Sequence, residues 1–458
     1  MNSRRLLLRT AESITVLITL RRDVIPSRRS VTSTLRNATF IDSPVLTLSV
    51  FALLLCAHFV NAADWPRWRG PENTGWAPAD AAVPESLPAG PKLLWEVKLG
   101  DGVGSPVVAG GRVFCLDNRD EKETLCAFEL ASGRELWSAP IDEVITDNTG
   151  TSPRGTPVAD GPRVFAQSCR GEFRCLDAAD GKPLWRVNFV KDFDAVFIGE
   201  KGQAQGASRH GYTGPPLVDG QRIIVGVGGR HGASVVCFDK TDGRVIWKSQ
   251  DDVPGYAGPV IATLAGVKQV VSFTSEGVIG LDAADGKLLW RMPVTTSFSR
   301  HITTPVVAGD MVVVSSHEAG LMGFRITTSA DGMKAERAWL RKDLAINFAS
   351  PVAVGRSLYG LGPKKQLFCL DIETGKDTWA KAGVVASPAA FVSMLVMKDK
   401  LLVLGDSGKL YLIAADPKEC RLLSSTKVCG KNWCNPAYVD GKLLTRDHES
   451  LRCLELLP

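Results

Sequence analysis

The sequence lacks the short motifs that identify the common catalytic and metal sites. It contains no G-x-S-x-G, no H-E-x-x-H, no Walker sequence and no C-x-x-C. These absences argue against a serine hydrolase elbow, a zinc protease, a phosphate-binding loop, a zinc ribbon and a thioredoxin-like site. Gly226-Val227-Gly228 opens a glycine-rich stretch, but it lies in a predicted hairpin without a βαβ unit around it, which excludes a dinucleotide site.

The sequence also has no excess of charge once its first residues are set apart. Of the 458 residues, 22% are charged and 45% are hydrophobic, which is typical of globular proteins and excludes a disordered or collagen-like chain. The formal charge is +5, but residues 1–63 hold eight arginines and three acids, and the remainder holds 46 basic and 46 acidic residues. We therefore expect no nucleic-acid partner.

An apolar run near the start predicts an export signal. Residues 45–60 read VLTLSVFALLLCAHFV, and Asn61-Ala62-Ala63 follows. Basic residues, then an apolar run, then small residues are typical of a signal peptide, here cleaved after Ala62 or Ala63. We predict a leader over 1–63 and a secreted or periplasmic protein. The alternatives are an uncleaved anchor, for which the run is short, and lipidation at Cys56.

Two patterns recur along the rest of the chain and predict a repeat protein. The first is a proline, a short strand, a turn and another strand, as in SPVVAGGRVF at 105–114. Eight copies, two of them weaker, follow one another at intervals of about 47 residues. The second is a strand, a turn and a tryptophan, as in LDAADGKPLW at 176–185. The tryptophans are Trp95, Trp137, Trp185, Trp247, Trp290, Trp339 and Trp379.

These repeats predict an all-β fold, an eight-bladed β-propeller with four-stranded antiparallel blades over residues 93–458. Asp-Gly pairs between the strands, such as Asp180-Gly181, supply the positive φ angles of tight hairpins. The last copy, at Cys453, has no closing strand of its own. Leu93-Leu94-Trp95 precedes the first copy and supplies one, so we expect an N-terminal strand to close the propeller.

We interpret the repeated tryptophans as structural docking residues on the outermost strands, where they fill the space between diverging blades. The residue ten positions before five of them is small, which we take as a sign of close contact between sheets near the axis. These small residues are Ala127, Cys175, Cys237, Gly280 and Cys369. Because the repeat spreads the cysteines around the propeller, we predict no metal site.

The tryptophan repeat resembles that of the quinoprotein dehydrogenases and of BamB, the propeller lipoprotein of outer-membrane β-barrel assembly. The whole of 64–458 is similar to secreted PQQ-like propeller proteins of the planctomycete type. The likeness lies in DWPRWRGP at 64–71 and in the stretches 232–247 and 256–290. This resemblance implies the propeller fold, whereas members of the family do different things.

The resemblance leaves an enzyme as the leading alternative, a PQQ-dependent (quinoprotein) alcohol or sugar dehydrogenase. Such an enzyme implies PQQ with calcium on the axis, an aspartate base and often a vicinal Cys-Cys disulfide. This sequence has no Cys-Cys, and its repeated aspartates share one repeat position, which favours turn formation. They are Asp177, Asp239, Asp282 and Asp371. We therefore predict no catalytic residue and no cofactor. A carbohydrate-binding or carbohydrate-active propeller is the second alternative.

Polar and aromatic residues that enter the innermost strands predict a ligand site in the axial funnel. Such a set could hold an anionic, sugar or peptide ligand through charge-assisted hydrogen bonds and stacking. The alternative is that these side chains bond loop carbonyls and bind nothing. The candidates are Arg154, Arg209, His210, Tyr256, Arg300, His301, Asn347 and Trp433. An insertion at 191–211 is either a lid over this face or a long loop.

The segment WPRWRGPENTGW at 65–76 is predicted to be a strap over 64–92, packed on the propeller with arginine stacked on tryptophan. Arg67 and Arg69 between tryptophans leave a glycan or nucleic-acid site as the alternative. Together these features predict an exported, non-catalytic propeller that binds or scaffolds in the cell envelope, in the manner that the resemblance to BamB implies. We expect a monomer with an envelope protein or a small ligand on its axial face and no transmembrane domain after leader removal.

Overall fold

The computed structural model describes residues 6–9, 15–18, 64–199 and 204–457. Most of the predicted leader, 1–63, therefore lies outside the described residues. Within it, strands β1 (Leu6–Arg9) and β2 (Thr15–Ile18) pair as an antiparallel hairpin. This part belongs to a compact unit separate from the one that holds the repeats.

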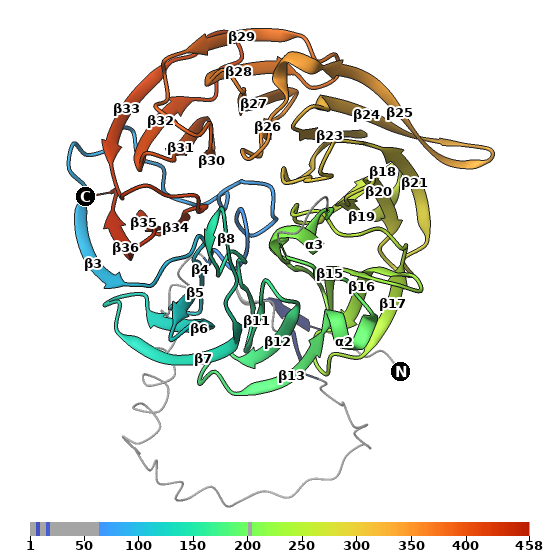
Figure 1. The fold of residues 1–458 in the computed structure, drawn as a ribbon. Helices are drawn as coiled ribbons and strands as arrows, with labels where there is room; N and C mark the ends of the chain where they lie inside the picture. The colour runs from blue at the N-terminus through green and yellow to red at the C-terminus, as the bar shows by residue number, and fades with distance from the viewer. Residues whose placement is uncertain (1–5, 10–14, 19–63, 200–203, 458) are drawn as a thin grey trace, which may run out of the picture. The chain divides into compact units, whose positions relative to one another are not determined.

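The repeats form eight four-stranded antiparallel sheets that follow one another around an axis, so the predicted propeller is confirmed (Figure 1). Blade 1 holds β4 to β7, blade 2 β10 to β13, blade 3 β14 to β17, and blade 4 β18 to β21. Their bounds are β4 Val107–Ala109, β5 Arg112–Arg119, β6 Lys122–Glu129, β7 Glu135–Glu143, β10 Val158–Asp160, β11 Arg163–Gln167, β12 Glu172–Asp177, β13 Pro183–Asn188, β14 Leu217–Asp219, β15 Arg222–Gly229, β16 Ala233–Asp239, β17 Val245–Ser249, β18 Val260–Leu264, β19 Val267–Phe273, β20 Gly277–Asp282 and β21 Leu288–Pro293.

The second half repeats this arrangement. Blade 5 holds β22 to β25, blade 6 β26 to β29, blade 7 β30 to β33, and blade 8 β34 to β36 with β3. Their bounds are β22 Val306–Ala308, β23 Met311–Ser316, β24 Gly320–Ser329, β25 Gly332–Arg341, β26 Val352–Val354, β27 Ser357–Leu361, β28 Gln366–Asp371, β29 Asp377–Ala382, β30 Val392–Met397, β31 Lys400–Gly405, β32 Lys409–Ala414, β33 Leu422–Lys427, β34 Ala437–Val439, β35 Lys442–Arg446, β36 Ser450–Glu455 and β3 Lys92–Lys98.

Blade 8 is closed by the N-terminal strand, as predicted. β3 pairs antiparallel with β36, and Trp95 lies opposite Cys453. The outermost strand of the last blade therefore comes from the start of the repeat region. Because β36 has a hydrogen-bonded neighbour on both sides, it is not left as an edge strand of the last blade.

The repeated aspartates hold the outer hairpins. Each carboxylate accepts a hydrogen bond from a backbone amide two residues later, at 2.7 Å from Ala179 to Asp177 and 2.8 Å from Ala284 to Asp282. The glycine of each turn has a positive φ, for example 77° at Gly286. These side chains act locally on the backbone, as Asx turns do.

Most of the repeated tryptophans dock on the next blade. Trp137 donates its indole N–H to the Ala178 carbonyl at 3.2 Å, and Trp339 donates to the Ile372 carbonyl at 2.9 Å. The indole ring covers the turn glycine of that blade, since a Cβ at Gly181 would lie 2.5 Å from the Trp137 ring. Trp95, Trp185, Trp247 and Trp379 donate to the following blade in the same way.

Trp290 differs from the others because blade 5 has a longer outer hairpin. Its indole N–H donates to the Gln269 side chain of its own blade at 2.6 Å.

The small residues paired with the tryptophans have a different role from the one expected near the axis. Gly280 lies directly opposite Trp290, and a Cβ there would meet the indole at 2.2 Å. The small residue thus makes room for the tryptophan of its own blade.

The strap runs along the innermost strands instead of lying on an outer surface. Trp65 exchanges two backbone hydrogen bonds with Val108 of β4, at 2.8 and 2.9 Å. Farther along the strap, Ala77 donates to the Val396 carbonyl of β30 at 2.9 Å. Between these points the strap contacts blades 2, 3, 5 and 6. It therefore crosses the centre of the propeller.

The strap arginines bond carbonyl oxygens, which differs from the predicted stacking on tryptophan. Arg67 donates to the Val218 carbonyl at 3.1 Å, and Arg69 donates to the Pro351 carbonyl at 2.6 Å. Arg69 is 2% exposed, and burial lowers its pKa to about 10. Both guanidinium groups are thus used to fix the strap to the blades.

Candidate functional site

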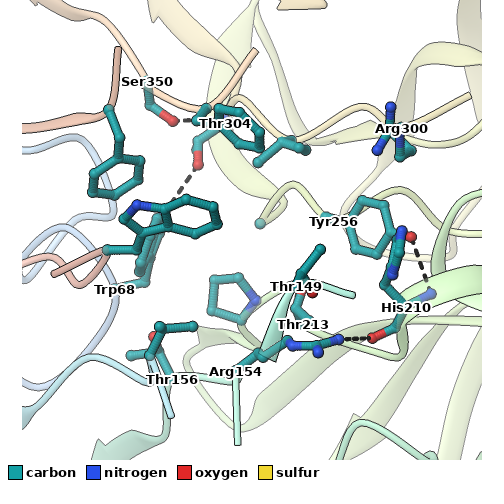
Figure 2. A pocket seen from close by; sticks show the side chains of 17 residues that line it. Trp68, Thr149, Arg154, Thr156, His210, Thr213, Tyr256, Arg300, Thr304 and Ser350 are labelled. Atoms are coloured by element: carbon teal, nitrogen blue, oxygen red, sulfur yellow. Dashed lines mark hydrogen bonds between the residues drawn. The ribbon is translucent and has the colours of Figure 1, made fainter. Parts of the chain in front are cut away.

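A cavity of about 220 Å³ lies on the axis, at the end where the chain enters the innermost strands (Figure 2). The segments before all eight blades contribute to its wall, and the strap contributes Trp68. The lining residues are Trp68, Val103, Thr149, Arg154, Thr156, His210, Thr213, Pro215, Tyr256, Gly258, Arg300, Ile302, Thr304, Phe348, Ser350, Phe391 and Trp433.

The lining follows the repeat. Seven lining residues occupy the position three before the proline that opens each innermost strand: Val103, Arg154, Thr213, Tyr256, Ile302, Phe348 and Trp433. Five more occupy the position one before that proline: Thr156, Pro215, Gly258, Thr304 and Ser350. Side chains alternate between two sides of an extended chain. Odd offsets from the proline therefore face the axis.

The structure brings five of the eight candidate ligand residues to this cavity and leaves three outside its lining. Those that line it are Arg154, His210, Tyr256, Arg300 and Trp433. His301 and Asn347 stand four before the proline, next to the lining residue at the third position, so their side chains lie on the other side of the extended segment. Arg209 borders a neighbouring cavity that Asp147 also lines.

His301 is a buried core residue. It is 0% exposed, its ring stacks on Phe273 with centroids 4.3 Å apart, and its two nitrogens lie 2.9 Å from Ser316 Oγ and 3.1 Å from the Val294 carbonyl. Burial lowers its pKa to about 4, so the ring is neutral at pH 7. Such a side chain stabilises the fold and does not face a ligand.

One wall of the cavity is a hydrogen-bonded cluster around Asp147, which lies in the hairpin of β8 (Thr146–Asp147) and β9 (Gly150–Thr151). Arg154 binds both oxygens of this carboxylate, at 2.8 and 2.9 Å. His210 Nδ1 lies 2.8 Å from Asp147 Oδ2, and Arg209 Nε donates to His210 Nε2 at 2.9 Å. The imidazole is therefore the Nδ1–H tautomer.

The hydrogen bonds of this cluster hold the loops of the cavity wall in position. Burial acts to raise the pKa of Asp147, but hydrogen bonds from Arg154, Thr149 and His210 outweigh it and hold the pKa far below its ordinary value. Arg154 also donates to the carbonyls of His210 and Gly150, at 2.8 and 2.7 Å. Its positive charge is balanced by Asp147, so Arg154 positions two loops.

Tyr256 joins the wall to the insertion at 191–211. Its hydroxyl donates to the Gly206 carbonyl and accepts from the His210 amide at 3.3 Å. Burial raises the pKa of this hydroxyl well above its ordinary value. The insertion forms helices α2 (Phe189–Phe193) and α3 (Ala207–His210), and Ala207 donates to the Pro254 carbonyl at 2.9 Å. The second half of the insertion, for which a lid and a long loop were the two alternatives, therefore forms part of the cavity wall.

Arg300 stands apart from the Asp147 cluster. Its guanidinium carbon lies 4.8 Å from the centroid of the Phe298 ring, and that of Arg209 lies 4.6 Å from the same ring. Among the described residues, Arg300 Nε is buried and has no hydrogen-bond partner. A cation–π contact holds this guanidinium without neutralising it.

Aromatic side chains form the opposite part of the lining. The Trp433 ring lies 5.5 Å from Phe348 and 6.1 Å from Phe391, centroid to centroid, at interplanar angles of 31° and 27°. Trp68 forms part of the same lining and donates its indole N–H to Thr304 at 3.1 Å. Figure 2 shows Trp68 and Arg300 on opposite sides of the cavity.

Sequence reasoning missed Trp68, Asp147, Phe348 and Phe391. The repeat spacing could have identified Phe348, because it stands three residues before Pro351, as Arg154 stands three residues before Pro157. Trp68 belongs to the strap, whose path across the centre has no counterpart in the repeat. Asp147 and Phe391 lie in segments without a repeated position, so no spacing identifies them.

The lining residues do not suit calcium or a quinone held with it. Among the described residues, no Asp or Glu lines the cavity, and calcium requires several oxygen ligands, mainly carboxylates. Within the described part of the chain, no group of three His, Cys, Asp or Glu side chains could hold a metal ion. The chemistry that this lining offers is binding by stacking and hydrogen bonding.

Comparison with known proteins places the chain in a family. The family model described as "Outer membrane protein assembly factor BamB" matches residues 88–144 and 121–381, more than half of the chain. The chain belongs to the BamB family. BamB of Shewanella oneidensis is 22% identical over 392 residues, which cover 80% of this chain and 89% of that protein.

Solved structures share the fold. BamB from Moraxella catarrhalis aligns with a TM-score of 0.53 and 14% identity over 80% of this chain and 97% of that one. The quinohemoprotein alcohol dehydrogenase from Comamonas testosteroni aligns with a TM-score of 0.57, also at 14% identity, over 88% of this chain and 82% of that one. At such identities both likenesses concern the propeller alone. The BamB relationship therefore rests on the family match and the curated relative.

The described helices are short. In the part of the chain that the structure covers, none combines the length and the apolar character that crossing a bilayer requires.

Proposed function

We propose that this protein is an exported, non-catalytic BamB-like propeller that binds other proteins of the cell envelope, with the loops around the axial cavity as its binding face. The observation that carries the proposal is the BamB family match over most of the blades. The relatives that the chain matches along most of their length are named for outer membrane protein assembly. The absence of a carboxylate from the described cavity lining supports a binding role over quinoprotein chemistry.

The axial face suits a docking role because its loops are held rigidly. The Asp147 cluster ties the β8–β9 hairpin to α3, and the strap ties six blades together at the centre. A pre-organised surface binds with a smaller loss of conformational freedom. Export is part of the proposal and rests on the apolar run at 45–60 and the small residues after it.

Co-purification from envelope extracts tests the proposal. The full chain, tagged at its C-terminus, is expressed in the organism that carries it and recovered after crosslinking. We expect outer-membrane assembly proteins among the recovered partners, and N-terminal sequencing is expected to find a mature chain that starts at Ala63 or Asp64. Phe391→Ala on the axial face is expected to reduce recovery, whereas Arg337→Ala on the exposed side of β25 leaves it unchanged.

Two results would overturn the proposal. One is recovery of the full, unprocessed chain from the cytoplasmic fraction without envelope partners. The other is dye-linked alcohol or sugar oxidation by the purified protein after addition of PQQ and calcium, which would make the protein a quinoprotein dehydrogenase.

A further inference from the structure

We infer that the axial cavity binds a small ligand that joins one aromatic ring to a carboxylate. The inference rests on the proposed function in one respect, namely that the cavity is a binding site and not a catalytic one. It adds the chemical class of the ligand. Three observations carry it: the size of the cavity, its aromatic part, and the buried N–H groups that have no partner.

The size fits a single ring with a short polar extension. The cavity measures about 220 Å³. An engineered apolar cavity of about 150 Å³ is enough to bind benzene. The extra volume corresponds to a few heavy atoms beyond the ring.

The aromatic part of the lining selects a flat apolar group. Trp433, Phe348 and Phe391 lie with their rings at small mutual angles, 31° and 27° from Trp433. Aromatic rings prefer offset-stacked or edge-to-face contacts with centroids about 4.5–7 Å apart. A ligand ring placed beside this group gains such contacts, and a saturated ring of the same size does not.

The uncommitted polar atoms of the lining select an acceptor group on the ligand. Of the described lining residues, the buried side-chain nitrogens and oxygens without a partner are Arg300 Nε and Trp433 Nε1. Both are N–H donors, and the carboxylate inferred here is assigned to Arg300. A buried donor without an acceptor is unfavourable, so each such atom in a native structure calls for an explanation. A carboxylate satisfies donors without needing any acceptor in return, whereas a sugar hydroxyl also needs acceptors.

The charges of the lining arginines also favour a carboxylate on the ligand. The Arg154 cation in the wall is balanced by Asp147, but Arg300 rests on the Phe298 ring. Arg300 contributes to lowering the pKa of Glu318, whose carboxylate is bound by the Ser297 amide and hydroxyl at 2.9 and 2.8 Å. A ligand carboxylate at Arg300 would supply a charge-assisted hydrogen bond, which is stronger than a neutral one.

Calorimetry with three matched probes tests the inference on the unaltered full chain. The probes are 3-phenylpropionate, its amide, and 3-cyclohexylpropionate. We expect 3-phenylpropionate to bind at least about tenfold more tightly than the amide, which lacks the charge. We also expect it to bind several-fold more tightly than the cyclohexyl acid, which has the charge but cannot stack.

Variants then locate the site. Arg300→Gln and Trp433→Leu are each expected to weaken 3-phenylpropionate binding about tenfold. The matched control Arg337→Gln changes an exposed arginine of β25 and is expected to leave the affinity within twofold. Circular dichroism confirms that each variant is folded.

Two results overturn the inference. One is absence of heat for 3-phenylpropionate at millimolar concentration. The other is equal affinity for the acid and its amide. Neither result bears on recovery of envelope partners, and a failed co-purification leaves the calorimetry unaffected, so the two proposals fail separately.

Discussion

Glu123 is a carboxylic acid with no contact with solvent. It lies on β6 and is 0% exposed, and both of its oxygens accept from the Cys169 amide of blade 2 at 3.2 Å. Burial raises the pKa of Glu123 to about 7, although hydrogen bonds from Ser152 and Cys169 act to lower it. The folded protein therefore holds a proton between about pH 4.5 and 7 that the unfolded chain releases.

This proton links stability to pH. Because the folded state binds more protons in that window, the free energy of unfolding falls as pH rises from about 4.5 to 7. The contribution of Glu123 to this fall is roughly 3 kcal/mol. We expect Glu123→Gln to remove that part of the slope and to raise stability at pH 8 relative to the unaltered protein. Urea unfolding at pH 5 and pH 8 measures both. Glu72→Gln, at an exposed strap position, is the control, and identical slopes for the Glu123 variant and the unaltered protein would contradict the prediction.

Several single site residues were predictable because they share a repeat position. Arg154, Tyr256 and Trp433 all stand three before an opening proline, so one rule of spacing finds them and also finds Phe348. The role of each side chain was not predictable in the same way. Arg154 and Arg300 both line the cavity, but only Arg154 meets a carboxylate, and that carboxylate belongs to a loop that the repeat does not contain.

At the scale of the blade, the outer hairpin works together with the tryptophan of the blade before it. Gly286 has a φ of 77°, and a Cβ there would lie 2.5 Å from the Trp247 ring. The same turn also accepts the Trp247 indole N–H at the Ala283 carbonyl, at 3.3 Å. The turn thus has two requirements, a left-handed backbone and an uncovered face for the indole.

Two glycine variants separate these requirements. Gly286→Ala combines left-handed strain, about 1–2 kcal/mol, with overpacking against the indole, about 1–3 kcal/mol. We expect it to destabilise the protein by roughly 2–5 kcal/mol. Gly309 also has a positive φ, 56°, but no atom lies within 4 Å of a Cβ built there. Gly309→Ala should therefore cost only the strain. Equal losses in urea unfolding would show that docking of Trp247 contributes nothing.

The hairpins were readable from the sequence because Asp-Gly has few other uses between two strands. The different hydrogen bond of Trp290, beside blade 5, could not be predicted from the sequence. Trp290 follows an LDAADG segment identical to the one before Trp185, yet its indole donates to Gln269, because the following blade has a long hairpin where the other blades have a short turn.

At the scale of the whole molecule, β3 ties the start of the repeat region to its end. Removing residues 1–98 leaves β36 without its outer neighbour and removes the strap as well. We expect this truncated chain to self-associate through the exposed edge, and we expect a synthetic peptide of residues 64–98 to restore the monomer. Light scattering after size-exclusion chromatography measures both. A truncated chain that stays monomeric with an unchanged unfolding midpoint would contradict the prediction.

The closed propeller was predictable because the repeat, the missing last strand and the spare strand before the first copy agree with one another. The path of the strap was not predictable, since its contacts are backbone bonds to strands with which it shares no pattern. That path decides where the cavity ends, because Trp68 of the strap forms part of its lining.

The strap also imposes an order on biogenesis. It is among the first parts of the propeller to leave the ribosome, but Val108, Pro351 and Val396, to which it binds, are all made later. Trp433, which also lines the cavity, is made almost last. A nascent chain can build separate blades, but it cannot yet hold Trp68 and Trp433 around one space. Ligand recognition is therefore a property of finished chains only, so occupancy of the cavity would report that synthesis and folding are complete.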